Sequence, residues 1–140
     1  MYEGEREIRA IVAEFRAGWN AHDPARVAAV FADDAEFTNF RGDRAHGRVG
    51  VRAFHTTVFE GIFKETVLTV DGIRVRPVTD NVASVDVWWS MTGARNEDGG
   101  LRPPRRGLMD LIVSRAPEGP WQILVYHNLE LPRGAPGPAQ

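Results

Sequence analysis

Apolar residues recur at every third or fourth position over the first twenty residues of the chain. The members of this series are Ile8, Ile11, Val12, Phe15 and Trp19. Because an α-helix has 3.6 residues per turn, these positions share one side of a helix. The spacing therefore predicts an amphipathic helix over about residues 5–20, with one buried stripe.

A second helix is predicted to start just after the first. Asp23 can cap free backbone N–H groups, and Pro24 fits the first helical position. The apolar side of this helix would consist of Val27, Val30 and Phe31. We expect Asp33 and Asp34 to cap the end of this helical region and to turn the chain.

The period then changes to two in "DDAEFTNFRG", which predicts a short strand. Phe37 and Asn39 lie on the same side of that strand and are predicted to point inward. Residues 42–47 form a turn-rich return. A third helix is predicted from about residue 49 to 62, and its apolar stripe consists of Val51, Phe54, His55, Val58 and Ile62.

From residue 64 onward, strand patterns alternate with turn signals at "DG", "TDN", "EDGG" and "PEGP". Four long strands are predicted near 64–77, 82–93, 105–115 and 121–131. Helices followed by a meander of strands indicate an α+β fold, with three N-terminal helices packed on a curved antiparallel sheet. We expect one domain over residues 1–131 and a disordered tail over 132–140, because "PRGAPGPAQ" has almost nothing to bury.

A trial hairpin register predicts which sheet face is buried. It places Trp89 opposite Gly107 and Met109 opposite His127, on an otherwise apolar face that packs against the helices. Gly107 would leave room beside the indole, so this face can line a cavity. The opposite face would hold Asp86, Trp88, Ser90, Arg106, Asp110, Tyr126 and Asn128. Its apolar members suggest contact with a second subunit.

Composition and charge narrow the function classes. Seventeen Lys and Arg residues against 19 Asp and Glu give a net charge of -2, which does not suit a nucleic-acid partner. The absence of cysteine excludes disulfides, thiolate metal sites and cysteine nucleophiles. No apolar run is long enough for a membrane span, and no leader pattern follows Met1. We expect a soluble, cytoplasmic protein without a metal or other cofactor.

Several short motifs resemble one known family. They are "WNAHDPARVAAVFADDAEFTNF" with the Gly at 42, "GR" at 47–48, His55, "VR" at 75–76 and the Trp, Ile and "HN" of 121–128. With the order of predicted elements, they make the chain similar to the NTF2-like superfamily, in its SnoaL-like branch, and within that branch to the SgcJ/EcaC family. The resemblance covers nearly the whole domain, without the tail.

This resemblance implies a cone-shaped α+β barrel that holds a hydrophobic small molecule in its opening and forms a homodimer through the sheet. It also implies a place in bacterial secondary metabolism, of the polyketide, enediyne or other antibiotic type. Ketosteroid-isomerase-like members have a carboxylate base inside the cavity, whereas the register here puts Asp86 and Asp110 outside. No cofactor motif supports oxidoreductase chemistry.

The candidate catalytic residues are His127 and His55, because a neutral imidazole can take or give a proton near pH 7. The candidate ligand-binding residues are Asn39, Phe37, Trp89, Met109 and Asn128. Each also has a structural interpretation: a core histidine, a core tryptophan, or, for Asn128, an outward dimer contact. Arg105 and Arg106 could steer an anion or be ordinary surface.

Three functions stay open at this point. One is an enzyme that isomerises, cyclises or dehydrates a hydrophobic intermediate by proton transfer without a cofactor. Another is a protein that binds or sequesters such a molecule without turnover. The third is a homodimerisation module that fills its cavity with its own side chains. In the enzyme hypothesis, replacing His127 by Gln removes turnover and leaves ligand affinity.

Overall fold

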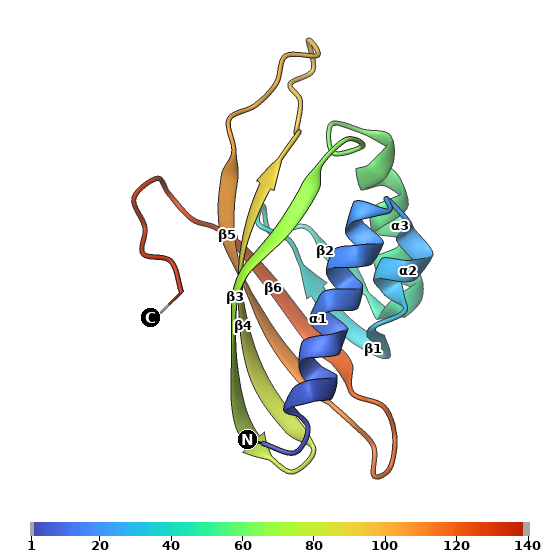
Figure 1. Ribbon diagram of the computed structural model, residues 1–140. Coiled ribbons are helices and arrows are strands. Elements are labelled where there is room, and N and C mark those ends of the chain that lie inside the picture. The colour runs from blue at the N-terminus through green and yellow to red at the C-terminus, as the bar shows by residue number, and fades with distance from the viewer. Residues whose placement is uncertain (1, 139–140) are drawn as a thin grey trace.

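The computed structural model describes residues 2–138, and three helices lie on one face of a curved six-stranded sheet (Figure 1). The helices are α1 (Glu5–Asn20), α2 (Pro24–Ala28) and α3 (Gly47–Glu60). The strands are β1 (Phe31–Thr38), β2 (Arg44–His46), β3 (Val67–Thr79), β4 (Val82–Thr92), β5 (Arg105–Ser114) and β6 (Gln122–Glu130). The strand order in the sheet is β2-β1-β6-β5-β4-β3. The predicted α+β class is confirmed.

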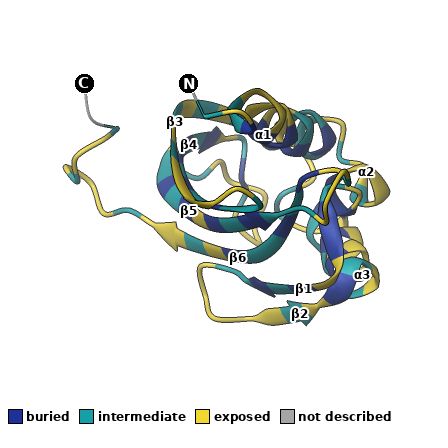
Figure 2. Cartoon of the chain, turned by 90° about the horizontal axis from the view of Figure 1, so that it is seen from below, coloured by how far each residue is buried: buried dark blue, intermediate teal, exposed yellow. Residues whose placement is uncertain are grey.

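The helices form where the apolar period predicts them. Four of the five stripe residues of α1 are buried, and Trp19 is half-buried. At the start of α2, the Asp23 carboxylate accepts a hydrogen bond from the backbone N–H of Arg26 at 3.1 Å, as a capping residue does. In α3, Val51 and His55 are buried against the sheet. Figure 2 shows the sheet curving around this buried interior.

Strand β1 begins earlier than the sequence predicts. Phe31 is the first residue of the strand and is fully buried, and it pairs with Ile123 of β6. Asp33 and Asp34 therefore lie within β1 and do not cap a helix, and Asp33 forms an ion pair with Arg48 at 2.7 Å. Tertiary pairing with β6 overrides the local helical pattern here.

The pairing of β1 and the presence of β2 also differ from the predicted sheet. Strand β1 pairs with β6 in parallel, so the sheet is mixed and not wholly antiparallel. The predicted turn at 42–47 contains the short strand β2, which pairs antiparallel with β1. Pairing of distant segments decides both features, and neither leaves a local pattern in the sequence.

The predicted register is right between β4 and β5 and wrong over part of β6. Trp89 lies opposite Gly107, and Val113 lies opposite Ile123, as predicted. A bulge then shifts the β5–β6 ladder by one residue, so Met109 lies opposite Asn128 and Asp110 lies opposite His127. One inserted residue reverses the faces of all positions beyond it.

This shift corrects the predicted orientation of His127. Its side chain is exposed on the sheet face away from the helices, whereas Tyr126 is buried and Asn128 is half-buried on the inner face. The trial register predicts the opposite orientation for both Tyr126 and Asn128. The inner polar residue of β6 is therefore Asn128, one position after His127.

Beyond β6, residues 132–138 form neither helix nor strand and lie on the side of the sheet opposite the helices (Figure 1). Arg106 donates a hydrogen bond to the carbonyl oxygen of Ala135 at 2.6 Å. Pro138 lies so close to Gly72 that a Cβ at residue 72 would be 2.6 Å from it. Of the helices in residues 2–138, none is long and apolar enough to cross a membrane.

Candidate functional site

An inner cavity of about 60 Å³ lies between the helices and the sheet. Residues from α1, α3, β1, β4, β5 and β6 contribute to its wall. The wall consists of Trp19, Phe37, Asn39, Phe40, Phe54, His55, Val58, Phe63, Trp89, Met91, Arg105, Tyr126 and Asn128. Most of these side chains are aromatic, so the wall favours apolar groups, and the volume admits only a small part of a ligand.

A larger vestibule of about 490 Å³ adjoins this cavity. The two share part of their walls, namely Asn39, Phe40, Phe54, Val58 and Phe63. Thr57, Gly61 and Ile62 at the end of α3 extend the vestibule, and Arg41 and Arg102 add its charged groups. Its volume is in the range of pockets that hold small organic molecules, about 300–1,000 Å³.

Phe37 organises the aromatic wall. Its ring stacks on Tyr126 with a centroid separation of 4.5 Å and an angle of 8°. The ring centroids of Phe54 and His55 lie 4.9 and 5.3 Å from that of Phe37, with Phe54 tilted by 53° and His55 by 80°. Because Phe37 is only 1% exposed and contacts both polar residues, it holds His55 and Tyr126 against one ring.

His55 is buried in α3, with 1% of its surface exposed. Its Nδ1 lies 2.8 Å from the carbonyl oxygen of Val51, which accepts a hydrogen bond from the Nδ1–H tautomer. Burial lowers the pKa of His55 from 6.5 to about 4, although the hydrogen bond with Val51 acts in the opposite direction. The imidazole is therefore neutral at pH 7, and Nε2 carries the free lone pair.

Tyr126 of β6 lies on the inner face of the sheet, whereas the trial register predicts it on the outer face. It is 4% exposed, and burial raises the pKa of its hydroxyl above the usual 10.0. The hydroxyl therefore stays protonated at physiological pH and can donate a hydrogen bond into the cavity. The β5–β6 bulge, which brings it inward, has no signal in the residue pattern.

Trp89 reaches across β5 to hold Asn128. A Cβ on Gly107 would be 2.0 Å from the Trp89 ring, so the indole occupies the space that a side chain would need. The Trp89 Nε1–H donates to Asn128 Oδ1 at 2.8 Å. The indole itself fills the space over Gly107, so the room that the sequence predicts beside the indole is not left open there. The Asn128 Nδ2 group has no hydrogen-bond partner among residues 2–138, so its two donors are available to a ligand.

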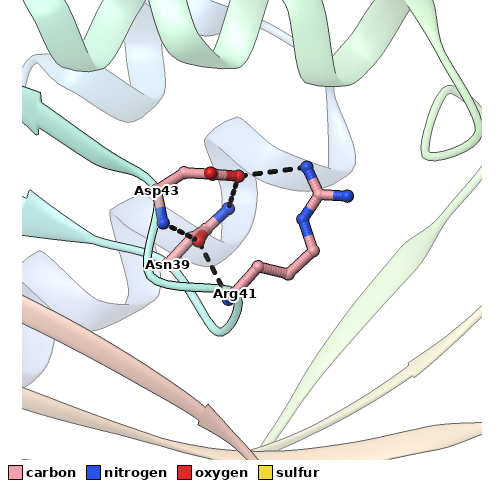
Figure 3. A network of polar contacts seen from close by, with 3 residues as sticks. All are labelled: Asn39, Arg41 and Asp43. Atoms are coloured by element: carbon pink, nitrogen blue, oxygen red, sulfur yellow. Dashed lines mark hydrogen bonds and ion pairs between the residues drawn. The ribbon is translucent and has the colours of Figure 1, made fainter.

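Asn39 has a structural task at the end of β1. Its Oδ1 accepts hydrogen bonds from the backbone N–H groups of Arg41 and Asp43 at 2.9 and 2.8 Å, and its Nδ2 donates to the Asp43 carboxylate at 3.2 Å (Figure 3). Arg41 bonds the same carboxylate at 3.0 Å. Asn39 thus lines both cavities, and its side-chain amide stabilises the loop between β1 and β2 through these hydrogen bonds.

The structure brings five of the seven predicted site residues together: Phe37, Asn39, His55, Trp89 and Asn128 line the inner cavity. Met109 is not part of this wall, because it is buried in the core opposite Asn128. His127 points away from it, so the orientation predicted for a catalytic role is wrong.

On the outer face, His127 belongs to a charged row across four strands. Arg74, Asp86, Asp110 and His127 are successive cross-strand neighbours on β3, β4, β5 and β6. Hydrogen bonding with Asp86, partial burial and the charge of Asp86 raise the pKa of Asp110 from 3.8 to about 6, while His127 lowers it. Across residues 2–138, no three His, Cys, Asp or Glu side chains are grouped to hold a metal ion.

Comparison with known proteins identifies the family. The family model described as a SnoaL-like domain matches residues 12–111, which is more than half of the chain. The protein therefore belongs to the SnoaL-like domain family. No match was found among curated proteins.

Solved structures show the same fold. An uncharacterized protein with a cystatin-like fold from Caulobacter vibrioides is 25% identical, with a TM-score of 0.84 over 94% of this chain and 92% of that chain. A domain of unknown function with a cystatin-like fold from Nostoc punctiforme is 28% identical, with a TM-score of 0.81 over 96% and 81%. A ketosteroid isomerase-like protein from Erwinia carotovora atroseptica is 19% identical, with a TM-score of 0.76 over 94% and 99%, and shares the fold.

Proposed function

We propose that the protein binds a hydrophobic, oxygen-bearing small molecule in the inner cavity and vestibule and transfers a proton on it without a cofactor. The reaction would be an isomerisation, a cyclisation or a dehydration. The observation that carries this proposal is a neutral imidazole and a protonated phenol held against the same ring, Phe37, in an aromatic cavity. Both groups can exchange a proton or a hydrogen bond with a ligand.

The two groups have different tasks in this proposal. Nε2 of His55 accepts a proton from an activated C–H group, and the electron pair of that bond moves onto the carbonyl oxygen of the substrate. The Tyr126 hydroxyl donates a hydrogen bond to this developing enolate oxygen. The proton then returns from His55 to another carbon. The low pKa of His55 makes it a weak base that gives the proton back readily.

Family membership and the motifs of 19–42 and 121–128 support a finer proposal. The chain would be a SgcJ/EcaC-type member of the SnoaL-like family and act on a polyketide or enediyne intermediate of bacterial secondary metabolism. The ketosteroid isomerase-like neighbour supports only the fold. The chemistry rests on the cavity itself.

Binding without turnover is the second candidate function. Two observations favour it: no Asp or Glu is in the wall of either cavity, and the pKa of His55 lies well below 7. A site with this wall can hold a flat molecule by aromatic contact and by hydrogen bonds from Asn128 and Tyr126 without abstracting a proton.

A deuterium-exchange experiment separates these functions. 2-Tetralone, a flat aromatic ketone with acidic α-hydrogens, is incubated with the protein in D₂O, and deuterium uptake is followed by mass spectrometry. Catalysis predicts faster uptake than in buffer, lost in His55→Gln and reduced in Tyr126→Phe. The matched control His127→Gln should retain the rate, because His127 is exposed on the other face. If native mass spectrometry shows bound ketone but neither the wild-type protein nor any variant accelerates deuterium uptake, binding without turnover is the supported function.

We also propose that the chain forms a homodimer through the outer sheet face. Trp88, Leu108 and Ile112 are half-buried on this face, and Trp88 lies opposite Leu108. Neighbouring apolar side chains on a sheet face are typical of a protein–protein contact. Sedimentation equilibrium tests it: the wild-type chain should have twice the monomer mass, and Leu108→Glu should sediment as a monomer. A wild-type monomer at micromolar concentration would contradict the proposal.

A further inference from the structure

Arg105, the first residue of β5, has an unusual setting for an arginine. Its side chain is only 10% exposed and forms part of the inner cavity wall. The guanidinium carbon lies 4.8 Å from the ring centroid of Phe40, 5.4 Å from that of Phe63 and 5.6 Å from that of Trp89. Aromatic faces attract a cation but supply no hydrogen-bond acceptor strong enough to replace water.

The hydrogen-bonding capacity of this guanidinium is only partly used. Nε and Nη2 both contact the same oxygen of Glu130, Oε1, at 2.7 and 2.5 Å. Nη1 contacts the sulfur of Met91 at 3.7 Å, which is a weak acceptor. Within residues 2–138, no other side chain forms an ion pair or a hydrogen bond with this group. A guanidinium has five donors in a planar fork, so an edge remains for a second anion.

Glu130 compensates this charge incompletely. Its side chain is 42% exposed, against 10% for Arg105, so solvent screens the carboxylate more than it screens the guanidinium. The other charged residues in the walls of the cavity and vestibule are Arg41 and Arg102, and neither wall contains Asp, Glu or Lys. Arg102 bonds a neutral partner, the Asn96 side chain, at 3.0 Å. Arg41 is paired with the Asp43 carboxylate outside the walls, at 3.0 Å. The walls themselves thus contain arginines and no carboxylate.

We propose that the ligand of this pocket is an aromatic or polycyclic carboxylate whose anionic group binds Arg105 while its ring system lies among the aromatic residues of the vestibule. This inference rests on the proposed function, because it names the class of molecule that the same cavity takes. Arg105 is then a residue that determines specificity: it selects charged acids over their esters and amides. Phe40 and Phe63 hold the guanidinium in place and also contact the ring system.

The test uses two probes of equal shape and different charge, anthracene-2-carboxylate and anthracene-2-carboxamide, titrated by fluorescence at pH 7.5. A charge-assisted bidentate hydrogen bond predicts that the carboxylate binds the wild-type protein about tenfold or more tightly than the amide. Arg105→Met should abolish this preference and leave the affinity for the amide. Equal affinities of the two probes for the wild-type protein would overturn the inference.

Two further variants control for net charge and for folding. Arg115→Met removes a charge that also lies over an indole, that of Trp121 at 5.1 Å, but at a residue outside both cavities, so the preference should persist. Glu130→Gln removes the competing carboxylate at an exposed side chain and should increase the preference severalfold. An unchanged or lower preference in Glu130→Gln would contradict the role of Arg105, even where Arg105→Met fails to fold.

The outcomes also separate this inference from the proposed function. Equal affinities for the two probes would support the hydrophobic cavity as a binding site and would contradict only the inferred preference for a carboxylate. Failure of both probes to bind the wild-type protein contradicts small-molecule binding itself, and the inference falls with it.

Discussion

One histidine lies at each face of the sheet, His55 of helix α3 at the inner face and His127 of β6 on the outer face, and their surroundings are opposite. His55 packs against the inner face among aromatic rings and is 1% exposed, whereas His127 lies on the outer face and is exposed beside Asp110. The inner face suppresses charge, since burial lowers the pKa of His55 to about 4. The outer face tolerates a row of charges. The inner cavity is thus built from neutral groups and one arginine, Arg105.

The largest expected effect is the loss of the inner aromatic wall. Phe37→Ala removes the ring that stacks on Tyr126 and touches His55, and should lower the free energy of unfolding by about 3–5 kcal/mol. Leu108→Ala, at a half-buried outer position, should cost about 1 kcal/mol. Urea denaturation measures both. Equal losses would mean that the two faces do not differ in packing.

The pH dependence of stability sharpens the contrast between the histidines. The pKa of His55 is about 4 in the folded state against 6.5 for the free side chain, so the unfolded chain binds the proton first as pH falls. The contribution of His55 is therefore complete above pH 6.5 and is lost as pH falls toward 4, by about 3 kcal/mol. His55→Gln should show a flatter stability curve over this window. His127→Gln, the control, should retain the loss of stability between pH 6.5 and 4 that burial of His55 causes, because His127 is exposed on the other face.

Neighbouring substitutions on β6 test the register directly. Asn128→Ala leaves the indole N–H of Trp89 without its acceptor and should cost about 1–3 kcal/mol. His127→Ala removes an exposed side chain and should change stability by no more than about 0.5 kcal/mol. Thermal denaturation of the two variants distinguishes the register with the bulge from the register without it. A larger loss for His127→Ala would restore the register without a bulge.

The smallest expected effect concerns the outer row. Asp110 has a raised pKa of about 6, so its folded-state penalty is absent below pH 3.8, grows as pH rises from 3.8 to 6 and is complete above 6. Asp110→Asn should therefore stabilise the protein most above pH 6, by at most about 1 kcal/mol because solvent screens this exposed carboxylate. Melting temperatures at about pH 4 and pH 8 should show the gain mainly at pH 8. This sign is opposite to that of His55.

Local patterns in the sequence determined much of this protein. The helical period placed His55 on the buried side of α3, and the alternation of β4 and β5 placed Trp89 opposite Gly107. These features follow from residues close together in the chain, because side-chain direction repeats every 3.6 residues in a helix and every two in a strand. They are enough to predict the fold class and five of the cavity residues.

Only the tertiary structure decided the rest of the site. The bulge in the β5–β6 ladder turns Tyr126 and Asn128 inward and His127 outward, and the parallel pairing of β1 with β6 begins the strand at Phe31. The burial of Arg105 depends on Phe40 and Phe63, which are more than forty residues away in the chain. Each of these depends on contacts between distant segments. A change of one residue in strand pairing alters the facing of a side chain without altering the local pattern that predicts the strand.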